Sequence, residues 1–475
     1  LIKCVGEYKK YVFLTPIFVC LEVLLEVLVP FMMKDLIDKG IDVGNMPYTL
    51  KMGALLIGFA VVSLVCGMIA GRTSSIATAG FAHNVRREMF HKVQEYSFSN
   101  IDKFSTSSIV TRLTTDVTNV QQAFMMVIRV AIRAPLMMII SLIFAFQVNA
   151  KLSVMYLCAI PVLGIALFSI QRFAHPIFEK VFHIYDKLNM VVQENLSGIR
   201  VVKSFVREDH EVDKFSKVSK DIYKNFAKAE KIVAFNMPIM QFTMYVCMIL
   251  ASWFGAKLIV YDGMTTGALS SIISYAAMIL SGLMMLSMVF VMIMISQASV
   301  ERINELLDEK STIVSPENPV MEVPDGSIEF DDVDFSYSSR ADKLCLKDVN
   351  LKIKSGQTVG IIGGTGSSKS TLVQMIPRLY DATSGTVKVG GIDVREYDLE
   401  VLRNSVSMVL QKNELFSGTI KDNLRWGDEH ATDEEIEHAC RLAQAAEFIE
   451  KLPNKYDTYI ERGGTNVSGG QKQRL

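Results

Sequence analysis

The segment 360–371 has the sequence GIIGGTGSSKST, which combines glycines, a lysine and hydroxyl groups. Glycines let successive backbone N–H groups point inward as a nest for phosphate oxygens. A lysine supplies a point charge for β- and γ-phosphates, and the hydroxyl after it can ligate Mg²⁺. The segment therefore predicts a nucleotide phosphate-binding loop. Its expected ligands are Gly363, Gly364, Thr365, Gly366, Ser367, Ser368, Lys369, Ser370 and Thr371, with Ser370 on Mg²⁺.

The elements around this loop have the order that a phosphate-binding loop requires. The apolar run 359–362 predicts a buried strand, and the residues from Leu372 to Ile376 predict a helix. Strand, glycine-rich turn, lysine and helix is the expected layout, and the helix N-terminus adds partial positive charge beside the phosphates.

Ser368 departs from the usual pattern, which has glycine just before the lysine. If the loop needs an unusual φ at this position, serine costs on the order of 1 kcal/mol that glycine does not. The alternative is that a small side chain fits there and nucleotide binding barely changes.

A second motif, Ser468-Gly469-Gly470-Gln471, lies about 100 residues after the loop. Together with the loop it resembles the signature motif of ATP-binding cassette (ABC) proteins, usually LSGGQ. The resemblance extends over nearly the whole chain. It implies that Ser468 begins a helix and that the motif binds the γ-phosphate of ATP held by a second chain, so that the functional unit is a dimer.

The resemblance also assigns residues between the two motifs. Tyr337 matches the aromatic residue that stacks on adenine, and Gln411 matches the glutamine that contacts Mg²⁺ and adjoins the membrane domain. We expect strands at 328–330, 333–335, 385–389 and 405–410, and a long helix over 432–452. Thr432 with Glu435 has the form of a capping box at the start of that helix.

The first 300 residues contain six apolar runs of about 20 residues, the length that spans a membrane. They lie at about 11–33, 52–70, 127–146, 152–170, 232–256 and 268–296. The lysines before the first run, Lys3, Lys9 and Lys10, predict a cytoplasmic N-terminus. An even number of spans then returns the chain to the cytoplasm, so we expect a plasma-membrane protein whose ATP-binding domain is cytoplasmic.

Two long polar loops, at about 72–126 and 172–231, separate pairs of these spans. Structureless loops of this length are improbable, so we expect the membrane helices to continue tens of ångströms into the cytoplasm. The segments 104–117 and 194–215 resemble the two coupling regions of exporter-type half-transporters. The alternative is that both are ordinary amphipathic helices.

Polar and methionine-rich positions within the spans are candidates for contact with cargo. Glu22 and Glu26 share one helix face, and either line a cavity for cations or protons or pair with a polar neighbour. We expect Arg129 and Arg133 to extend towards lipid headgroups. The methionines predict an adaptable apolar surface, with plain helix packing as the alternative. The cavity residues are Glu22, Glu26, Met240, Met244, Met288 and Met292.

The sequence thus predicts a six-helix α-helical membrane domain at 1–300, a linker at 301–326 and an α/β P-loop NTPase domain at 327–475. The acidic strand for Mg²⁺, the catalytic glutamate and the switch histidine of the family are expected beyond Leu475, so catalytic residues stay unknown. A formal net charge of −1 does not favour a nucleic-acid partner.

The expected function is ATP-driven export of amphipathic or hydrophobic molecules by alternating access, with ATP and Mg²⁺ as cofactors. Ser368 beside an intact signature favours a heterodimer with a second half-transporter over a homodimer. Alternatives are a lipid or peptide exporter, an importer with the same fold, and an ATP-gated channel or regulatory subunit.

Overall fold

The computed structural model describes residues 1–337, 343–410 and 413–475, and these form two units. One unit comprises Leu1–Glu95 and Ile101–Lys310, and the other comprises Tyr96–Asn100 and Ser311–Leu475. We call them the membrane unit and the C-terminal unit and describe each by itself.

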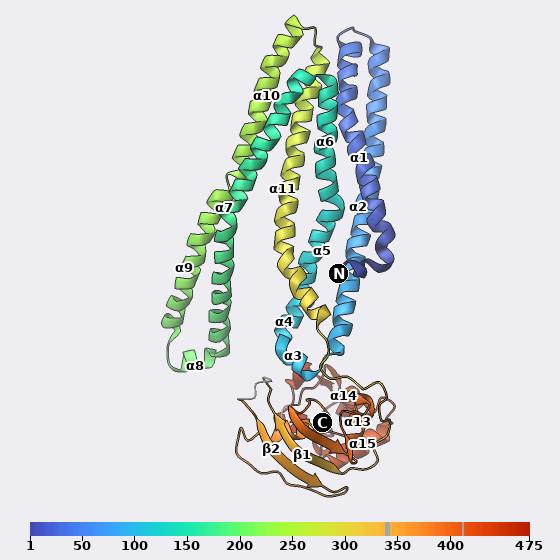
Figure 1. Cartoon of the computed structure of the whole chain (residues 1–475), viewed down its shortest axis with the longest axis vertical. Helices are drawn as coiled ribbons and strands as arrows, with labels where there is room; N and C mark the ends of the chain where they lie inside the picture. The colour runs from blue at the N-terminus through green and yellow to red at the C-terminus, as the bar shows by residue number, and fades with distance from the viewer. Residues whose placement is uncertain (338–342, 411–412) are drawn as a thin grey trace. The chain divides into compact units, whose positions relative to one another are not determined.

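The membrane unit consists of helices, with short 3₁₀ and π segments labelled η (Figure 1). Its elements, together with α3, which crosses the boundary between the units, are η1 (Ile2–Tyr8), α1 (Lys9–Leu36), η2 (Ile37–Ile41), α2 (Met46–Gln94), α3 (Phe98–Phe104), α4 (Thr106–Thr111), η3 (Arg112–Asp116), α5 (Val117–Met125), η4 (Met126–Val130), α6 (Ala131–Val148), α7 (Ala150–Ser197), α8 (Ile199–Ser204), α9 (Glu208–Val233), α10 (Asn236–Tyr261) and α11 (Thr266–Asp308).

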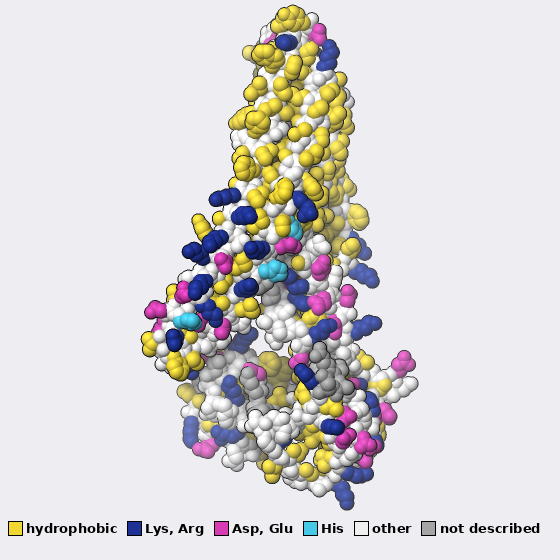
Figure 2. Space-filling model, turned by 60° about the vertical axis from the view of Figure 1, so that its left-hand side comes forward, with side chains coloured by type: hydrophobic (Ala, Val, Ile, Leu, Met, Phe, Trp, Pro, Cys, Tyr) yellow, Lys and Arg dark blue, Asp and Glu magenta, His cyan; other side chains and the backbone are white. Residues whose placement is uncertain are grey.

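Six helical stretches of the described chain are long and apolar enough to cross a membrane, which confirms the predicted spans. The helices also continue well past their apolar parts. At 1.5 Å per residue, the 49 residues of α2 extend over about 75 Å, more than twice the hydrocarbon thickness. Figure 2 shows hydrophobic side chains along one part of these helices and charged side chains along their continuation. The prediction of helical extensions is confirmed.

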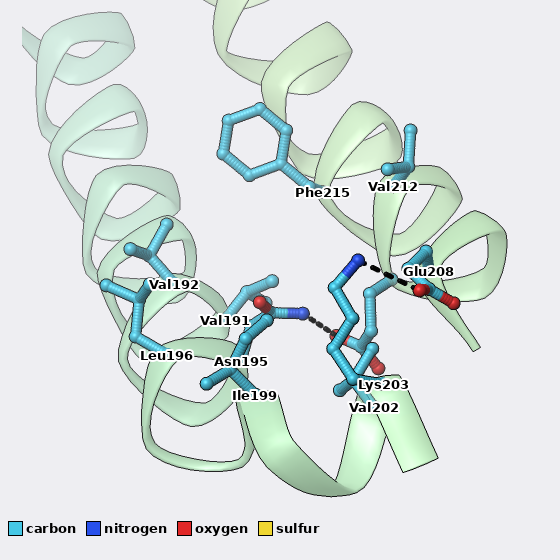
Figure 3. A pocket seen from close by; sticks show the side chains of 11 residues that line it. Val191, Val192, Asn195, Leu196, Ile199, Val202, Lys203, Glu208, Val212 and Phe215 are labelled. Carbon is cyan, nitrogen blue, oxygen red and sulfur yellow. Dashed lines mark hydrogen bonds and ion pairs between the residues drawn. The ribbon is translucent and has the colours of Figure 1, made fainter. Parts of the chain in front are cut away.

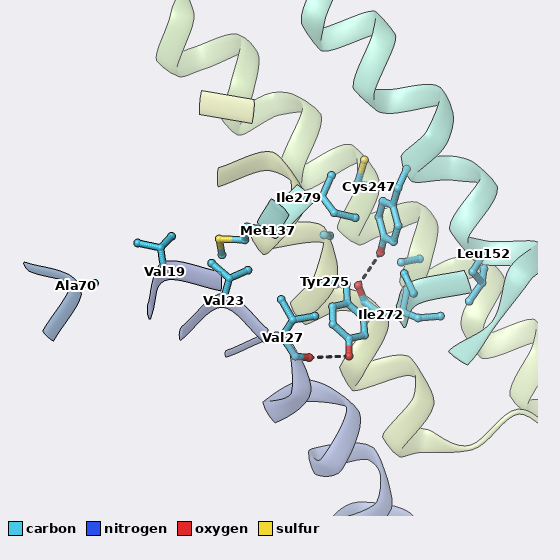
Figure 4. Close-up of a cluster of buried hydrophobic side chains, with 14 residues drawn as sticks. Val19, Val23, Val27, Ala70, Met137, Leu152, Cys247, Ile272, Tyr275 and Ile279 are labelled. Atoms are coloured by element: carbon cyan, nitrogen blue, oxygen red, sulfur yellow. Dashed lines mark hydrogen bonds between the residues drawn. The ribbon is translucent and has the colours of Figure 1, made fainter. Parts of the chain in front are cut away.

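The membrane unit has an apolar core, to which α1 contributes side chains at a regular spacing (Figure 4). Val19, Val23 and Val27 repeat every four residues on α1 and are fully buried. Two tyrosine hydroxyls in this core are paired with backbone carbonyls. Tyr275 donates its hydroxyl to the Val27 carbonyl at 3.1 Å. Tyr156 likewise donates to the Ile272 carbonyl at 2.8 Å. Hydrogen bonds between helices thus supplement close packing.

The C-terminal unit combines a sheet with short helices. Its elements are β1 (Ile328–Phe335), β2 (Leu346–Ile353), α12 (Lys369–Gln374), β3 (Ser384–Val389), β4 (Ile392–Asp393), α13 (Leu399–Ser405), β5 (Gly418–Thr419), α14 (Ile420–Leu424), α15 (Asp433–Leu442), α16 (Ala446–Ile449), η5 (Lys455–Asp457), β6 (Tyr459–Ile460), η6 (Arg462–Gly464) and α17 (Gly469–Arg474).

The larger sheet has the order β2-β1-β3-β4, and all its neighbouring strands are antiparallel. Phe330 on the central strand β1 is opposite Leu351 on one side and Val387 on the other. The two strands predicted at 328–330 and 333–335 are one strand, β1, with register shifts along it. The predicted strand at 385–389 is β3.

Three local predictions for the C-terminal part are wrong. Residues 359–362 and 405–410 are not strands, and Ile362 is 99% exposed instead of buried. A strand depends on hydrogen-bonded neighbours, and no described segment pairs with either run. The helix expected over 432–452 is divided into α15 and α16.

The linker prediction changes in detail, because α11 continues to Asp308 and residues 301–308 are therefore helical. The segment that follows up to β1 contains one isolated bridge, between Val320 and Tyr397.

Candidate functional site

The glycine-rich segment forms an exposed turn that leads directly into α12 (Lys369–Gln374). Gly366 has φ +85° and Ser368 has φ +58°, so the chain enters the left-handed region twice within three residues. Alternation between right- and left-handed backbone turns successive N–H groups to one side, which is the geometry of an anion nest.

Ser368 lies in the left-handed conformation that glycine adopts at the lowest cost, as its place in the pattern predicts. It is the N-cap residue of α12, yet its hydroxyl makes no capping hydrogen bond. The side chain therefore adds strain at this position without a local hydrogen bond to offset it.

Lys369 holds the turn together. Its ammonium donates to the carbonyls of Gly363 and Gly364, each at 2.8 Å, and to the Ser367 hydroxyl at 3.2 Å. A phosphate would have to replace these carbonyls as the partner of the ammonium. The Ser370 side chain beside it is exposed, and an exposed hydroxyl at this position suits a metal-bound phosphate.

Tyr337 lies next to the same helix and is half exposed. Its hydroxyl is 3.0 Å from that of the buried Thr371 and donates to Gln374 at 3.4 Å. Its ring contacts Phe335 and Tyr380 edge-on, with centroids 4.8 and 5.1 Å away. These contacts hold a half-exposed aromatic ring beside α12, and aromatic rings are the side chains on which bases stack.

A pocket of about 600 Å³ adjoins the loop and collects residues from three segments. Ile361, Lys369 and Ser370 come from the loop, Met408 from the segment before the predicted glutamine, and Gln473 from the last helix. Sequence reasoning missed Gln473 and Met408, because neither belongs to a motif. Gln411 itself lies outside the described residues.

Ser468 caps the last helix, α17, as predicted. A reciprocal capping box joins it to Gln471, whose side chain accepts from the Ser468 N–H at 2.8 Å. Ser468, Gly469 and Gly470 are exposed. The start of this helix is therefore open to solvent, with backbone N–H groups that have no partner within the helix.

The carboxylates predicted in the membrane unit are paired. Arg133 reaches Glu22 at 2.5 Å and Glu26 at 2.6 Å, and its side chain is 18% exposed. The prediction that Arg133 extends to headgroups is therefore wrong, since two carboxylates on the first helix offer a closer charge-assisted partner. Glu22 and Glu26 also line a pocket of about 520 Å³, together with Arg129.

The four predicted cavity methionines do not join these carboxylates. Met240 and Met244 pack against an apolar cluster of Leu163, Leu167 and Leu280. Met288 is 60% exposed, and Met292 is intermediate. Among the described residues that line the carboxylate pocket, Met68 is the methionine present. Met240 and Met244 thus follow the packing alternative.

The second coupling region is a helical turn with an apolar hollow of about 420 Å³ (Figure 3). Side chains from α7, α8 and α9 point into it, among them Leu196, Ile199 and Phe215. Ion pairs close its edge, since Lys203 donates to Glu208 at 2.9 Å. The coupling role of this region stays a prediction.

The first coupling region contains a charged network within the membrane unit. Arg302 on α11 donates to the buried Asp116 carboxylate at 2.8 Å, and Ser299 donates to the same carboxylate at 2.8 Å. Arg112 binds Glu305 at 2.7 Å. The segment that groups with the C-terminal unit is Tyr96–Asn100, which precedes the predicted region 104–117.

Both parts of the chain are similar to known protein families. A model described as "ABC transporter transmembrane region" matches residues 12–284, and one described as "ABC transporter" matches residues 346–475. The chain is 36% identical to the uncharacterized ABC transporter ATP-binding protein YfiB of Bacillus subtilis, covering 100% of the chain and 83% of the relative.

Two further relatives extend the comparison. An uncharacterized ABC transporter ATP-binding protein of Mycobacterium tuberculosis is 32% identical, with 99% of the chain and 81% of the relative covered. The ATP-dependent lipid A-core flippase of Desulfotalea psychrophila is 31% identical, with 82% of the chain and 68% of the relative covered.

Proposed function

Because the chain belongs to the ABC transporter family, as an exporter-type half-transporter, we propose that it exports amphipathic or hydrophobic small molecules by alternating access. The protein is a multi-pass membrane protein with an ATP-binding ATPase domain coupled to transport, and half-transporters of this kind pair as dimers in a lipid bilayer. The nature and direction of the cargo are the proposed part.

The observation that carries the proposal is the pairing of an exposed phosphate loop with an exposed signature. Lys369 and the backbone of the loop would hold the phosphates of ATP, and Ser370 with Gln411 would hold Mg²⁺. Tyr337 would stack on the adenine. The open helix start at Ser468 would bind the γ-phosphate of ATP on the partner chain.

ATP then supplies binding energy that draws two C-terminal units together, and its hydrolysis releases them. This chain's part is to hold phosphates on one side and to present Ser468, Gly469 and Gly470 on the other. The two coupling regions would transmit the movement to the membrane helices.

We further propose an unequal pair in which this chain completes its partner's site. Ser368 has left-handed backbone that glycine favours, whereas Ser468 to Gln471 keep a regular cap. Such a combination suits a chain whose own site binds ATP but turns it over slowly, while its signature serves the partner. The expected location is the plasma membrane, with the N-terminus and the C-terminal unit in the cytoplasm.

A second candidate is movement of lipid between leaflets. It is supported by the relative named a lipid A-core flippase and by charged residues that line a pocket in the membrane unit. The same fold would serve both cargo classes, since the difference lies in the pocket.

The test uses inside-out vesicles that contain the full-length protein with its partner. ATP should drive accumulation of an amphipathic fluorescent dye, and Lys369→Ala combined with replacement of the corresponding loop lysine of the partner should abolish it. Accumulation that is independent of ATP, or passive ion flux on ATP binding, would contradict export.

A further inference from the structure

The pocket of the membrane unit that Glu22, Glu26 and Arg129 line has charged groups that are not all paired. Glu22 and Glu26 carry two negative charges and share one guanidinium, that of Arg133. One unbalanced negative charge therefore remains in this group of three. Glu22 Oε2 is buried and has no hydrogen-bond partner within the described structure. A buried acceptor without a donor is costly, especially when it is charged.

Arg129 provides the opposite charge on the wall of the same pocket. It makes no ion pair with any residue in the described ranges, although its side chain is half buried. The pocket is therefore dipolar, with an excess negative charge at the carboxylates and an unpaired positive charge at Arg129.

Two glycines of α2 make room for these charges. A Cβ on Gly67 would lie 3.0 Å from Glu22 Oε1, and a Cβ on Gly71 would lie 3.9 Å from Arg129 Nη1. The glycines are four residues apart, so the two charged groups flank positions about 6 Å apart along one helix. Leu64 and Met68 add an exposed apolar wall beside them.

A ligand must satisfy both charges to gain the most from this pocket. A simple cation would match the carboxylates but would leave Arg129 unpaired and repel it. A simple anion would match Arg129 and be repelled by the carboxylates. A zwitterion with a short link between its charges can pair with both at once.

We propose that this pocket binds the headgroup of a zwitterionic phospholipid, with its ammonium at Glu22 and Glu26 and its phosphate at Arg129. The ammonium must donate hydrogen bonds to the carboxylate oxygens. Phosphoethanolamine has N–H groups that can do so and therefore fits, whereas the quaternary nitrogen of phosphocholine has none. The acyl chains lie along Leu64 and Met68. The inference names a cargo class for the proposed transport and rests on that function for its meaning.

The test measures which lipids stay bound to the full-length transporter, assembled with its partner. The protein is reconstituted in vesicles of equal parts phosphatidylethanolamine, phosphatidylcholine and phosphatidylglycerol, then released in detergent, and its retained lipids are counted by native mass spectrometry. We expect phosphatidylethanolamine to be enriched about ten-fold over phosphatidylcholine, the effect of one charge-assisted hydrogen bond.

Three variants locate the binding. Glu26→Gln removes one carboxylate that faces the ammonium and should abolish the enrichment. Arg129→Gln removes the partner of the phosphate, which both lipids carry, and should lower the retention of phosphatidylethanolamine and phosphatidylcholine together. Neither variant should change the affinity for ATP. Gly67→Ala should weaken it by displacing the Glu22 carboxylate. Gly71→Ala is the matched control, because its Cβ makes an ordinary contact and should leave the enrichment intact.

Other results would contradict the assigned headgroup, the pocket or the proposed export. Equal retention of phosphatidylethanolamine and phosphatidylcholine, or preference for phosphatidylglycerol, overturns the assignment. Loss of dimer assembly in both glycine variants, with the lipid preference intact, would show a helix-packing surface instead. Enrichment of phosphatidylethanolamine without ATP-driven movement of any amphiphile would support the lipid site and refute the proposed export. ATP-driven movement without this enrichment would support export and refute the lipid site.

Discussion

Replacement of Ser368 by glycine should stabilise the protein while leaving nucleotide affinity nearly unchanged. Ser368 has φ +58° and ψ +24°, and its hydroxyl makes no capping hydrogen bond. A left-handed conformation costs an L-residue about 1–2 kcal/mol. Glycine loses about 0.5–1 kcal/mol more conformational entropy on folding, so the expected net gain is about 0.5–1 kcal/mol.

The affinity should hardly respond, because a phosphate nest is itself built from alternating right- and left-handed residues. The backbone of Ser368 needs the same φ before and after ATP binds, so the strain cancels from the Kd. We expect the Kd for ATP to change less than about two-fold, an effect under about 0.4 kcal/mol.

The assay is thermal unfolding of the full-length protein, with ATP binding measured on the same samples. Ser368→Gly should raise the Tm of the C-terminal transition by about 1–3 °C. Ser368→Ala is the matched control, because it removes the hydroxyl and keeps the strained Cβ, and it should not raise the Tm. A Tm that stays the same in Ser368→Gly, or a ten-fold tighter Kd, would refute the reasoning.

Perturbations at four further residues follow from the contacts described above. Tyr337→Ala should weaken ATP binding by about 1–3 kcal/mol, the worth of one stacked base, while Tyr337→Phe keeps the ring and most of the affinity, and titration with a fluorescent nucleotide checks both. Thr432→Ala breaks a complete capping box and should cost about 1 kcal/mol of stability in thermal unfolding at pH 7. A backbone hydrogen bond from Thr432 holds the pKa of Glu435 below its ordinary value of 4.5, so its stabilisation is complete above that pH and is lost as the pH falls through the lowered pKa. Glu435→Gln should therefore lose less stability than the wild type as the pH falls from 5 to 3, a range that begins about half a unit above that ordinary value and ends about 1.5 units below it. Asp116→Ala removes the partner of Arg302, whose side chain is 46% exposed. We therefore expect the free energy of unfolding to fall by only about 1–2 kcal/mol. A decrease below about 0.3 kcal/mol in thermal unfolding would show that the ion pair does not stabilise the protein.

The features that sequence predicted best are determined by neighbouring residues. The spans follow from apolar length alone, and the helix starts at Thr432 and Ser468 follow from cap residues three positions before their partners. The need for an unusual backbone at Ser368 follows from its place in a short loop. Each of these depends on a few residues that are adjacent in the chain.

The features that sequence missed depend on distant partners. Glu22 and Glu26 share a helix face, which was predictable, but their partner Arg133 comes more than one hundred positions later. The apolar run 359–362 was expected to be a strand, yet a strand exists only where another segment pairs with it. Gln473 lines the pocket beside Lys369 because the fold brings α17 there, and no motif contains that information.

The most direct test of the account is ATP hydrolysis by the full-length protein in lipid, alone and with candidate half-transporters. The account predicts little hydrolysis by this chain alone and full activity with one partner. That activity should survive Lys369→Ala in this chain and disappear with Ser468→Arg, because the working site would use the partner's loop and this chain's signature. Rapid hydrolysis by this chain alone, abolished by Lys369→Ala, would contradict the unequal pair and leave a homodimer.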